Sequence, residues 1–454
     1  MKKFDYDYVV IGSGAAGKAA ALMAGGAGLK TAIVEADRWG GNTLNYRNIP
    51  EAASVHFANL YRQAVKGARF GLSSANLRFN YPTALNWRLT AARRAGAGNT
   101  KDLEEVGVTP IKGFAHFVGP HEITVGEKKQ VTAKKFLIAT GSVLDEKGIT
   151  GVDSVPHLTP RTAMSAGRLP KVVLVAGGGA SGCEIAEYYA NLGVQVLLFE
   201  LSERLLPRED SEVGEMLEFY LTKQLGVKVL TQSRVIAIER SEGHKKVIFL
   251  RGGQEKAVKV EEIVVATGSK PAMDLGLENA GVKFSASGIK VGKNLQTSAK
   301  HIYAAGDVIG GKSSTEKATY EAAVATANVI NKGHSPVDYR GFARVTNTFP
   351  MVASVGMTED DCVRHARKYK VALAPLSVAN ASNIEDFRTG FVKLVGDRDG
   401  RIIGGTVVAP RADLIIQEVA LAVRQEIKAV DLAGTPHIAD SWGEIIKIAA
   451  RRLA

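Results

Sequence analysis

The chain of 454 residues contains only two cysteines, Cys183 and Cys362. So few cysteines exclude a secreted scaffold held together by disulfides, and we expect a cytoplasmic protein. No apolar run is long enough to span a bilayer, which predicts that there is no membrane segment. The nine histidines are dispersed, and no cysteine and histidine cluster has the spacing of metal ligands, so we expect no metal site.

Acidic residues are fewer than basic ones, and the formal net charge is +12. Such a balance attracts anionic partners when the charges gather on one surface. Here the basic residues occur in short, scattered groups such as Lys128-Lys129 and Arg451-Arg452, without a nucleic-acid motif. We therefore interpret the charge as a solvated basic surface and expect no nucleic-acid partner.

One pattern opens the chain: a strand, a glycine-rich turn, a helix, a second strand and an acidic residue. The apolar run 7–11 leads into Gly12-Ser13-Gly14-Ala15-Ala16-Gly17, an alanine-rich helix is expected from about Lys18 to Ala27, and the strand Thr31 to Val34 ends at Glu35. This spacing is typical of a dinucleotide site. The glycines allow a tight turn and close approach of a pyrophosphate, the helix N-terminus attracts the phosphates, and the acid accepts hydrogen bonds from ribose.

The same pattern returns in the middle of the chain. The strand 172–175 is followed by three glycines at the same spacing (Gly177, Gly179 and Gly182), a helix to about Leu192, and a strand that ends at Glu200. Two such sites indicate two dinucleotides, and the simplest pair is FAD with a nicotinamide nucleotide. Glu200 favours NADH because it would repel a 2′-phosphate, although Arg204 lies close enough in sequence to soften that preference.

Further motifs resemble the pyridine nucleotide–disulfide oxidoreductase family, which includes dihydrolipoamide dehydrogenase, glutathione reductase and mercuric reductase. An Ala-Thr-Gly segment follows each dinucleotide fold, at 139–141 and 266–268. The segment 302–307 resembles the family's second FAD fingerprint, with Asp307 on the ribityl chain, and 347–356 resembles the start of its dimerisation domain. The resemblance covers nearly the whole chain.

This resemblance implies an α/β fold with two Rossmann-like domains and a C-terminal α/β dimerisation domain. We expect residues 1–146 and 271–334 to form the FAD domain, 147–270 the NAD(P) domain and 335–454 the dimerisation domain of a homodimer. The residues expected to bind FAD are Gly12, Gly14, Ala15, Ala16, Gly17, Glu35, Gly41, Asn42, Thr140, Gly141, Gly306, Asp307 and Thr315. Those expected to bind NADH or NADPH are Gly177, Gly179, Gly182, Glu200 and Gly268.

A helix is expected from Lys317 to about Ile330, with a capping box formed by Ser313 and Glu316. In the family the N-terminus of this helix points at the pyrimidine edge of the flavin. A positive helix end at that edge would stabilise reduced, anionic flavin.

The chain departs from the family where the family carries its redox-active cysteine pair. The flanking residues of the segment 40–50 fit the family pattern, but Thr43 and Asn48 occupy the two cysteine positions. Neither side chain can form a thiolate or a disulfide. Cys183 and Cys362 lie elsewhere in the sequence, and we interpret both as buried structural residues.

Other parts of the family's thiol relay change as well. Ala52 replaces a lysine that pairs with a glutamate, while that glutamate, Glu184, remains; Arg47 is its candidate partner. Ala439 stands at the position of the catalytic histidine, which leaves Glu444 without the ring it orients unless the loop brings His437 inward. Ala180 replaces an aromatic lid over the nicotinamide pocket. Glu184, Arg47 and Glu444 are the candidate catalytic residues.

We therefore expect an FAD-dependent NAD(P)H oxidoreductase whose reduced flavin passes electrons directly to a small-molecule acceptor of quinone or dye type. In this interpretation Tyr46 and Arg47 line the acceptor side. Three alternatives stay open: a dihydrolipoamide dehydrogenase-like disulfide reductase that uses the two atypical cysteines, a catalytically silent flavoprotein that serves as a sensor or subunit, and a nicotinamide transhydrogenase.

Overall fold

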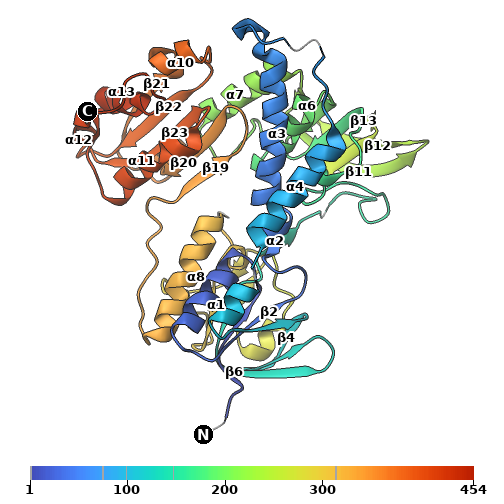
Figure 1. The fold of residues 1–454 in the computed structure, drawn as a ribbon, viewed down its shortest axis with the longest axis vertical. Helices are drawn as coiled ribbons and strands as arrows, with labels where there is room; N and C mark the ends of the chain where they lie inside the picture. The colour runs from blue at the N-terminus through green and yellow to red at the C-terminus, as the bar shows by residue number, and fades with distance from the viewer. Residues whose placement is uncertain (1–2, 74–75, 99, 147, 312–313) are drawn as a thin grey trace. The chain divides into compact units, whose positions relative to one another are not determined.

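The computed structural model describes residues 3–73, 76–98, 100–146, 148–311 and 314–454, which form two compact units (Figure 1). The first unit comprises Met1–Ala53, Asn86–Asp145 and Gly268–Tyr339, and the second comprises Ser54–Leu85, Glu146–Thr267 and Arg340–Ala454. Ser54–Leu85 falls within the predicted FAD domain but belongs to the second unit, because Phe57 and Tyr81 pack into the second unit's core. The division into three domains stays a prediction.

The first unit is built on a mixed sheet with the strand order β3-β2-β1-β6-β5-β4, and β18 pairs with β6 as well. Its parallel strands are β1 (Tyr6–Ile11), β2 (Thr31–Glu35), β3 (Thr109–Lys112), β6 (Lys129–Ile138) and β18 (Ile302–Ala304); β4 (Ala115–Gly119) and β5 (Glu122–Val125) are antiparallel. Ile138 pairs in register with both Ile11 and Ala304. The carboxyl ends of β1, β6 and β18 therefore meet at one edge, which brings together the chain segments that follow them.

Two helices, α1 (Ala15–Gly26) and α8 (Thr315–Ile330), lie side by side in the first unit (Figure 1). Their small buried residues, such as Ala20, Ala24 and Ala325, pack with Tyr8 and Tyr303 of the sheet. The first unit also contains α2 (Gly41–Asn45), α5 (Lys101–Glu105), β7 (Ser142–Leu144), β15 (Ser269–Pro271), β16 (Phe284–Ser285) and β17 (Gly288–Ile289), while α3 (Asn48–Lys66) and α4 (Tyr81–Gly96) continue from one unit into the other.

The second unit repeats the parallel arrangement in a four-stranded sheet of order β10-β9-β8-β14. These strands are β8 (Val172–Ala176), β9 (Gln195–Phe199), β10 (Lys228–Leu230) and β14 (Glu262–Val265), and the helices α6 (Ala180–Asn191) and α7 (Ser211–Phe219) follow β8 and β9. An antiparallel sheet of β11 (Ser233–Ser241), β12 (His244–Arg251) and β13 (Gln254–Val260) belongs to the same unit. The second dinucleotide pattern therefore forms the predicted strand–turn–helix.

The C-terminal part of the second unit is an antiparallel sheet of order β19-β20-β23-β22-β21 with helices packed on it (Figure 1). Its elements are β19 (Ala343–Thr346), β20 (Met351–Gly356), α9 (Glu359–Arg364), β21 (Lys370–Pro375), α10 (Asn380–Ile384), β22 (Phe391–Gly396), β23 (Ile402–Ala409), α11 (Ala412–Arg424), α12 (Ala429–Gly434) and α13 (Glu444–Leu453). Ile416 and Val419 of α11 pack with Leu394 and Val407 in its core. The predicted α/β fold class and the predicted helix from Ala412 to Arg424 are confirmed.

Candidate functional site

The first glycine-rich turn leaves open space at its middle glycine and closes tightly at the other two. A Cβ atom on Gly12 would lie 2.4 Å from the Ala139 carbonyl oxygen, and one on Gly17 would lie 1.8 Å from the Gly12 oxygen. A Cβ atom on Gly14 would meet nothing within 4 Å. Ala15, Ala16 and Gly17 already belong to α1, so the helix begins three residues earlier than predicted and its free N–H groups lie in the turn itself. This turn can cradle a pyrophosphate.

The acid at the end of β2 is held rigidly against the turn. One carboxylate oxygen of Glu35 accepts from the Ser13 N–H at 2.9 Å and from the Ser13 hydroxyl at 2.6 Å, and the other accepts from the Asp37 N–H at 2.7 Å. The Ser13 hydroxyl also accepts from the Gly40 N–H at 3.0 Å. A Cβ atom on Gly41 would lie 2.8 Å from the Gly14 Cα, so the start of α2 closes on the turn. Ser13 thus joins three predicted FAD segments, a role that the sequence analysis missed.

Asp307 follows β18 at the same edge of the sheet. Its Oδ2 accepts from the Ser142 hydroxyl at 2.9 Å, and Gly306 before it has a φ of +80°. The Gly306 N–H donates to Glu321 of α8 at 2.8 Å, and Glu321 also accepts from the Tyr339 hydroxyl at 2.7 Å. The Glu321 side chain is completely buried. Ser142 and Glu321 therefore position the predicted flavin-binding aspartate, and neither was predicted.

The Thr140-Gly141 crossing also lies in the first unit. The Thr140 hydroxyl donates to the Ala272 carbonyl at 2.7 Å, and the Ala272 N–H donates to the Gly141 carbonyl at 3.0 Å. Gly268, which was predicted at the nicotinamide nucleotide site, belongs to the first unit as well, where its carbonyl accepts from the Asp145 N–H. Its role in binding the nucleotide stays a prediction.

The segment at the family's cysteine positions runs from α2 into α3. Asn42 and Thr43 lie in α2, and Asn48 begins α3 with a φ of +35°. The Asn48 side-chain amide donates to the Thr315 hydroxyl at 2.9 Å, which ties this position to the start of α8. The amide, at a position predicted to correspond to a family cysteine, is therefore hydrogen-bonded to a residue predicted to lie by the flavin.

The two residues between Thr43 and Asn48 that were expected on the acceptor side have partners in the first unit. The Tyr46 hydroxyl donates to Asp37 at 2.9 Å, in the loop that follows Glu35. Arg47 Nε donates to Glu51 one turn later in α3, at 3.4 Å. A role of either residue at an acceptor stays a hypothesis.

The helix α8 begins two residues before the predicted Lys317. The predicted cap Ser313 lies outside the described residues, and the structure places the N-cap at Ser314, whose hydroxyl accepts from the Lys317 N–H at 3.1 Å. The predicted pair of Ser313 with Glu316 falls on the undescribed residue and stays a prediction. Thr315 is the first residue of the helix.

The second glycine-rich turn has the same geometry as the first. A Cβ atom on Gly177 would lie 2.4 Å from the Ala266 carbonyl oxygen, one on Gly182 would lie 1.7 Å from the Gly177 oxygen, and one on Gly179 would meet nothing within 4 Å. Glu200 accepts from the Gly178 N–H at 2.6 Å and from the Ser202 N–H at 2.7 Å. This turn can form a second cradle for a dinucleotide, with a rigid acid where a ribose is predicted to bind.

The candidate catalytic carboxylate Glu184 lies on α6, in the second unit. It is 5% exposed, and it accepts from the Asn347 N–H at 2.5 Å and from the Asn347 side chain at 3.2 Å. One turn later Glu187 accepts from the Phe349 N–H at 2.7 Å. The two carboxylates hold the backbone between β19 and β20, and the predicted pairing of Glu184 with Arg47 stays a prediction.

The residues considered for acid–base chemistry near the C-terminus also lie in the second unit. Glu444 is the first residue of α13, where a carboxylate suits the positive end of the helix. The His437 Nδ1 is 2.9 Å from the Thr435 carbonyl, and its Nε2 is 3.0 Å from Glu418 of α11. Glu418, and not Glu444, therefore orients the His437 ring.

Both cysteines are buried, free thiols in the second unit. Burial raises the pKa of Cys183 well above its ordinary value, and the neighbouring Glu184 raises it further. Burial likewise raises the pKa of Cys362. A thiol with a raised pKa supplies little thiolate near neutral pH, so neither residue is prepared for disulfide exchange.

Comparison with known families shows which family the chain belongs to. Residues 6–327 match the pyridine nucleotide-disulphide oxidoreductase family, and residues 342–450 match its dimerisation domain. The chain belongs to this family. Its members use FAD and NAD(P)H, which makes this protein an FAD-dependent oxidoreductase, and its dimerisation domain supports a homodimer.

The relatives are similar over nearly the whole chain. Dihydrolipoyl dehydrogenase of Thermus scotoductus is 34% identical, over 99% of this chain and 97% of its own length. Mercuric reductase of Bacillus cereus is 31% identical, over 95% of this chain and 69% of its own length. The crystal structure of LpdA from Mycobacterium tuberculosis superposes with a TM-score of 0.89 at 27% identity, over 98% of this chain and 99% of that one. The relatives' names favour the disulfide reductase alternative over the predicted non-disulfide acceptor.

Both cradles fit the cofactors of the family. At each turn only the middle glycine faces open space, which is where a pyrophosphate must approach the backbone. Among the residues that the structure describes, no group of three or more metal-ligating side chains is gathered, and no helix is long and apolar enough to cross a membrane.

Proposed function

We propose that this protein is an NAD(P)H oxidoreductase whose reduced flavin passes electrons directly to a quinone-type acceptor, without a disulfide between them. The observation that supports this is Asn48: the residue aligned with a family cysteine carries an amide, which is hydrogen-bonded to Thr315. An amide can neither take up electrons nor form a mixed disulfide. Both cysteines are buried free thiols in the second unit, and the pKa of each is raised.

Residues of the chain bind and orient the two nucleotides. The N-terminus of α1 and the Gly14 backbone receive the FAD pyrophosphate, while Glu35 accepts from ribose and Asp307 from the ribityl chain. Gly179 and Glu200 do the same for the nicotinamide nucleotide. FAD, when bound, supplies a two-electron carrier that accepts hydride from NAD(P)H and passes two electrons on. In sum, NAD(P)H, a proton and a quinone give NAD(P)⁺ and a hydroquinone.

A second candidate function is a disulfide reductase, which the names of the relatives favour. It requires Cys183 or Cys362 to exchange with a substrate disulfide. Such a role predicts that substituting these two residues abolishes the acceptor half-reaction.

Anaerobic stopped-flow absorbance separates these functions. We expect NADH to bleach the flavin and a water-soluble benzoquinone to restore its colour, while lipoamide does not. The double variant C183S/C362A should retain the quinone rate within about two-fold, because no thiol takes part. If the parent reduces lipoamide and the double variant does not, the disulfide reductase function is established. Absence of bleaching by both NADH and NADPH would instead favour a sensor or subunit.

The variant T43C/N48C serves as the positive control. It returns a cysteine to each of the two aligned positions, so it should acquire a thiol pair that reacts with disulfides. A long-wavelength charge-transfer band on reduction of the variant, absent from the parent, would show that these positions face the flavin. If the band is already present in the parent, the proposed function is wrong.

A further inference from the structure

The loop between β9 and α7, residues 201–210, follows Glu200, the acid predicted to face the ribose of the nicotinamide nucleotide. Glu200 cannot turn away from that ribose easily, because both its oxygens are held by backbone N–H groups at 2.6 and 2.7 Å. A carboxylate there accepts from the 2′-hydroxyl of NADH and repels the 2′-phosphate of NADPH. NADPH therefore needs a cation nearby, and Arg204 on this loop is the obvious candidate.

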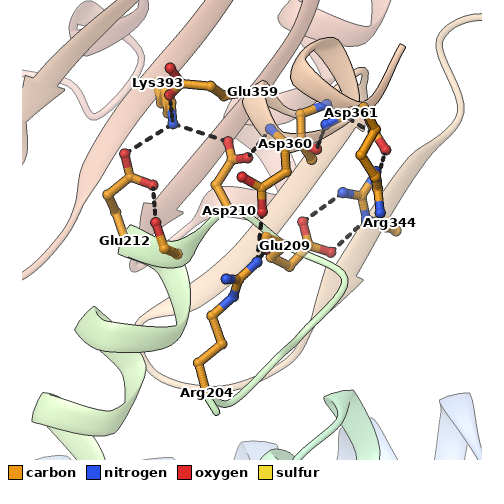
Figure 2. A network of polar contacts seen from close by, with 12 residues as sticks. Arg204, Glu209, Asp210, Glu212, Arg344, Glu359, Asp360, Asp361 and Lys393 are labelled. Carbon is orange, nitrogen blue, oxygen red and sulfur yellow. Dashed lines mark hydrogen bonds and ion pairs between the residues drawn. The ribbon is translucent and has the colours of Figure 1, made fainter. Parts of the chain in front are cut away.

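The Arg204 side chain points toward Glu209 and Asp360 (Figure 2). Its Nη2 donates to Asp360 of α9 at 2.6 Å and to the Glu209 carbonyl at 3.2 Å. Its Cβ and Cγ lie beside Gly214 of α7, where a Cβ atom would be 3.4 and 3.5 Å from them. The stem is thus packed, and the charged end is paired with a carboxylate from the C-terminal part of the unit.

Asp360 is itself held in place. It lies in the first turn of α9, whose N-cap Thr358 forms a capping box with Asp361. The Asp360 N–H donates to Asp210 at 3.2 Å, at the other end of the same loop. Arg204 therefore pairs with a carboxylate whose backbone is anchored to that loop.

A dense set of ion pairs holds the end of the loop (Figure 2). The Lys393 Nζ, on a side chain 2% exposed, lies 3.2 Å from Asp210, 3.0 Å from Glu212 and 2.6 Å from Glu359. Burial alone would lower the pKa of Lys393, but hydrogen bonds to Glu359 and Glu212 outweigh it and raise the pKa.

A second ion pair lies beside the first. Glu209, which is 8% exposed, accepts from Arg344 Nε at 2.5 Å and from its Nη2 at 2.6 Å. Buried charges paired this closely resist displacement, because breaking one pair leaves its partner unsatisfied. The loop is thus fixed where Arg204 is bound to Asp360.

We propose that Asp360 makes the protein selective for NADH, by withholding Arg204 from the 2′-phosphate of NADPH. Glu200 then acts without Arg204 to oppose it. Asp360 is a positioning residue in this role, since it acts through Arg204 and does not touch the nucleotide. The inference rests on the nucleotide half-reaction alone and is independent of which acceptor receives the electrons.

The test measures flavin bleaching by NADH and by NADPH in anaerobic stopped flow, without any acceptor. In D360N the apparent Kd for NADPH should fall by about five-fold, because a freed guanidinium can pair with the 2′-phosphate, while the Kd for NADH stays within about two-fold. The double variant D360N/R204A should lose the gain. R208A, which removes another arginine from the same loop, is the matched control and should leave the selectivity unchanged.

Binding of adenosine 2′,5′-bisphosphate, compared with adenosine 5′-monophosphate, gives a second readout that needs no electron transfer. The bisphosphate should bind D360N more tightly than the parent and should not gain in the double variant. Unchanged NADPH affinity in D360N overturns the proposal, as does a gain that persists without Arg204. If D360N does not fold, R204A alone decides: a selective loss of NADPH binding would show that Arg204 already contacts the 2′-phosphate and would refute the proposal.

The result can be separated from failure of the proposed function. If neither nucleotide bleaches the flavin, the oxidoreductase assignment fails, whereas the bisphosphate titration still reports on Asp360. If both nucleotides bleach it but no quinone reoxidises it, only the proposed acceptor is wrong.

Discussion

The two glycine-rich turns of this protein have nearly the same geometry where a nucleotide is expected to bind, and they differ in the residues that surround them. In both, the first and third glycines lie against backbone oxygens, the middle glycine faces open space, and an acid is held by two backbone N–H groups. The first turn is closed by α2 and by the Gly306-Asp307 segment, whereas the loop after the second acid forms ion pairs with α9 and β22.

This difference suits a resident cofactor and an exchanging one. The first site gathers three chain segments at one sheet edge, so a bound dinucleotide would contact residues that are far apart in sequence. The second site consists of one turn and one acid, and the loop that follows the acid is held by ion pairs with α9 and β22. A prosthetic group is retained by many contacts, whereas a substrate must leave after each turnover.

The largest expected effect comes from filling the open space in each turn separately. A Cβ atom at Gly14 or Gly179 meets no protein atom within 4 Å, so G14V and G179V should both fold. We expect G14V to be purified without flavin, because the side chain occupies the pyrophosphate cradle. G179V should stay yellow but be bleached by NADH at least about 100-fold more slowly. Flavin absorbance per chain and stopped-flow reduction measure the two effects.

The opposite pattern, with flavin lost from G179V and kept by G14V, would reverse the assignment of the two sites. Circular dichroism of both variants is the control for folding. Dithionite should still bleach G179V, since that reductant does not need the nucleotide cradle.

A smaller effect is expected from Glu321, a residue that supports the first site and has no counterpart described at the second. Glu321 is buried and accepts from the Gly306 N–H and the Tyr339 hydroxyl. E321A removes an acceptor from both donors and should weaken FAD binding by about ten-fold, as measured by fluorescence on reconstitution of the apoprotein. E321Q keeps an acceptor for Gly306 and should recover most of that loss. Equal affinity in E321A and the parent would show that Glu321 does not position the flavin segment.

Both turns and both acids were predictable from the sequence because their chemistry depends on residues at fixed spacing within one chain segment. Gly12 and Gly177 take positive φ values in their tight turns, Glu35 ends β2, and Glu200 directly follows β9. The start of α1 was placed too late because the helix takes in part of the glycine turn.

The supporting residues were not predictable, since their partners are distant in sequence. Glu321 looks like one polar residue in an alanine-rich helix, and only the fold brings it to Gly306. Ser13 carries no signal beyond its place between two glycines, although its hydroxyl joins Glu35 to Gly40. Asp360 and Arg204 are 156 residues apart, so no local pattern could pair them.

The helices that follow the two turns also differ. α1 buries alanines, whereas α6 buries Glu184 and Glu187. Burial raises the pKa of Glu187 to about 8, although the Phe349 N–H and Arg62 act in the opposite direction. A carboxyl whose pKa is raised on folding contributes stability below its unfolded pKa, and that contribution is lost as the pH rises through the folded value.

We therefore expect E187Q, which cannot ionise, to gain stability relative to the parent between about pH 5 and 8. Its melting temperature should exceed that of the parent by about 3 °C at pH 9, with a smaller difference or a reversal at pH 5. E215Q, at an exposed position of α7, is the control and should show no such trend. A difference that does not change with pH would mean that Glu187 is ionised throughout this range.

The smallest effect is expected from Tyr46, which contacts the loop that follows Glu35. Its hydroxyl donates to Asp37, whose N–H donates to Glu35, and its ring lies 5.6 Å from the Arg38 guanidinium carbon. Because an exposed hydrogen bond of this kind contributes little, Y46F should keep its flavin and reduce a benzoquinone within about two-fold of the parent rate. N48A is the matched comparison at the position aligned with a family cysteine, and we expect it to change the quinone rate more than Y46F does. A loss above ten-fold in Y46F, with unchanged bleaching by NADH, would place Tyr46 at the acceptor after all and would mean that the loop beyond Glu35 serves both the ribose and the electron acceptor.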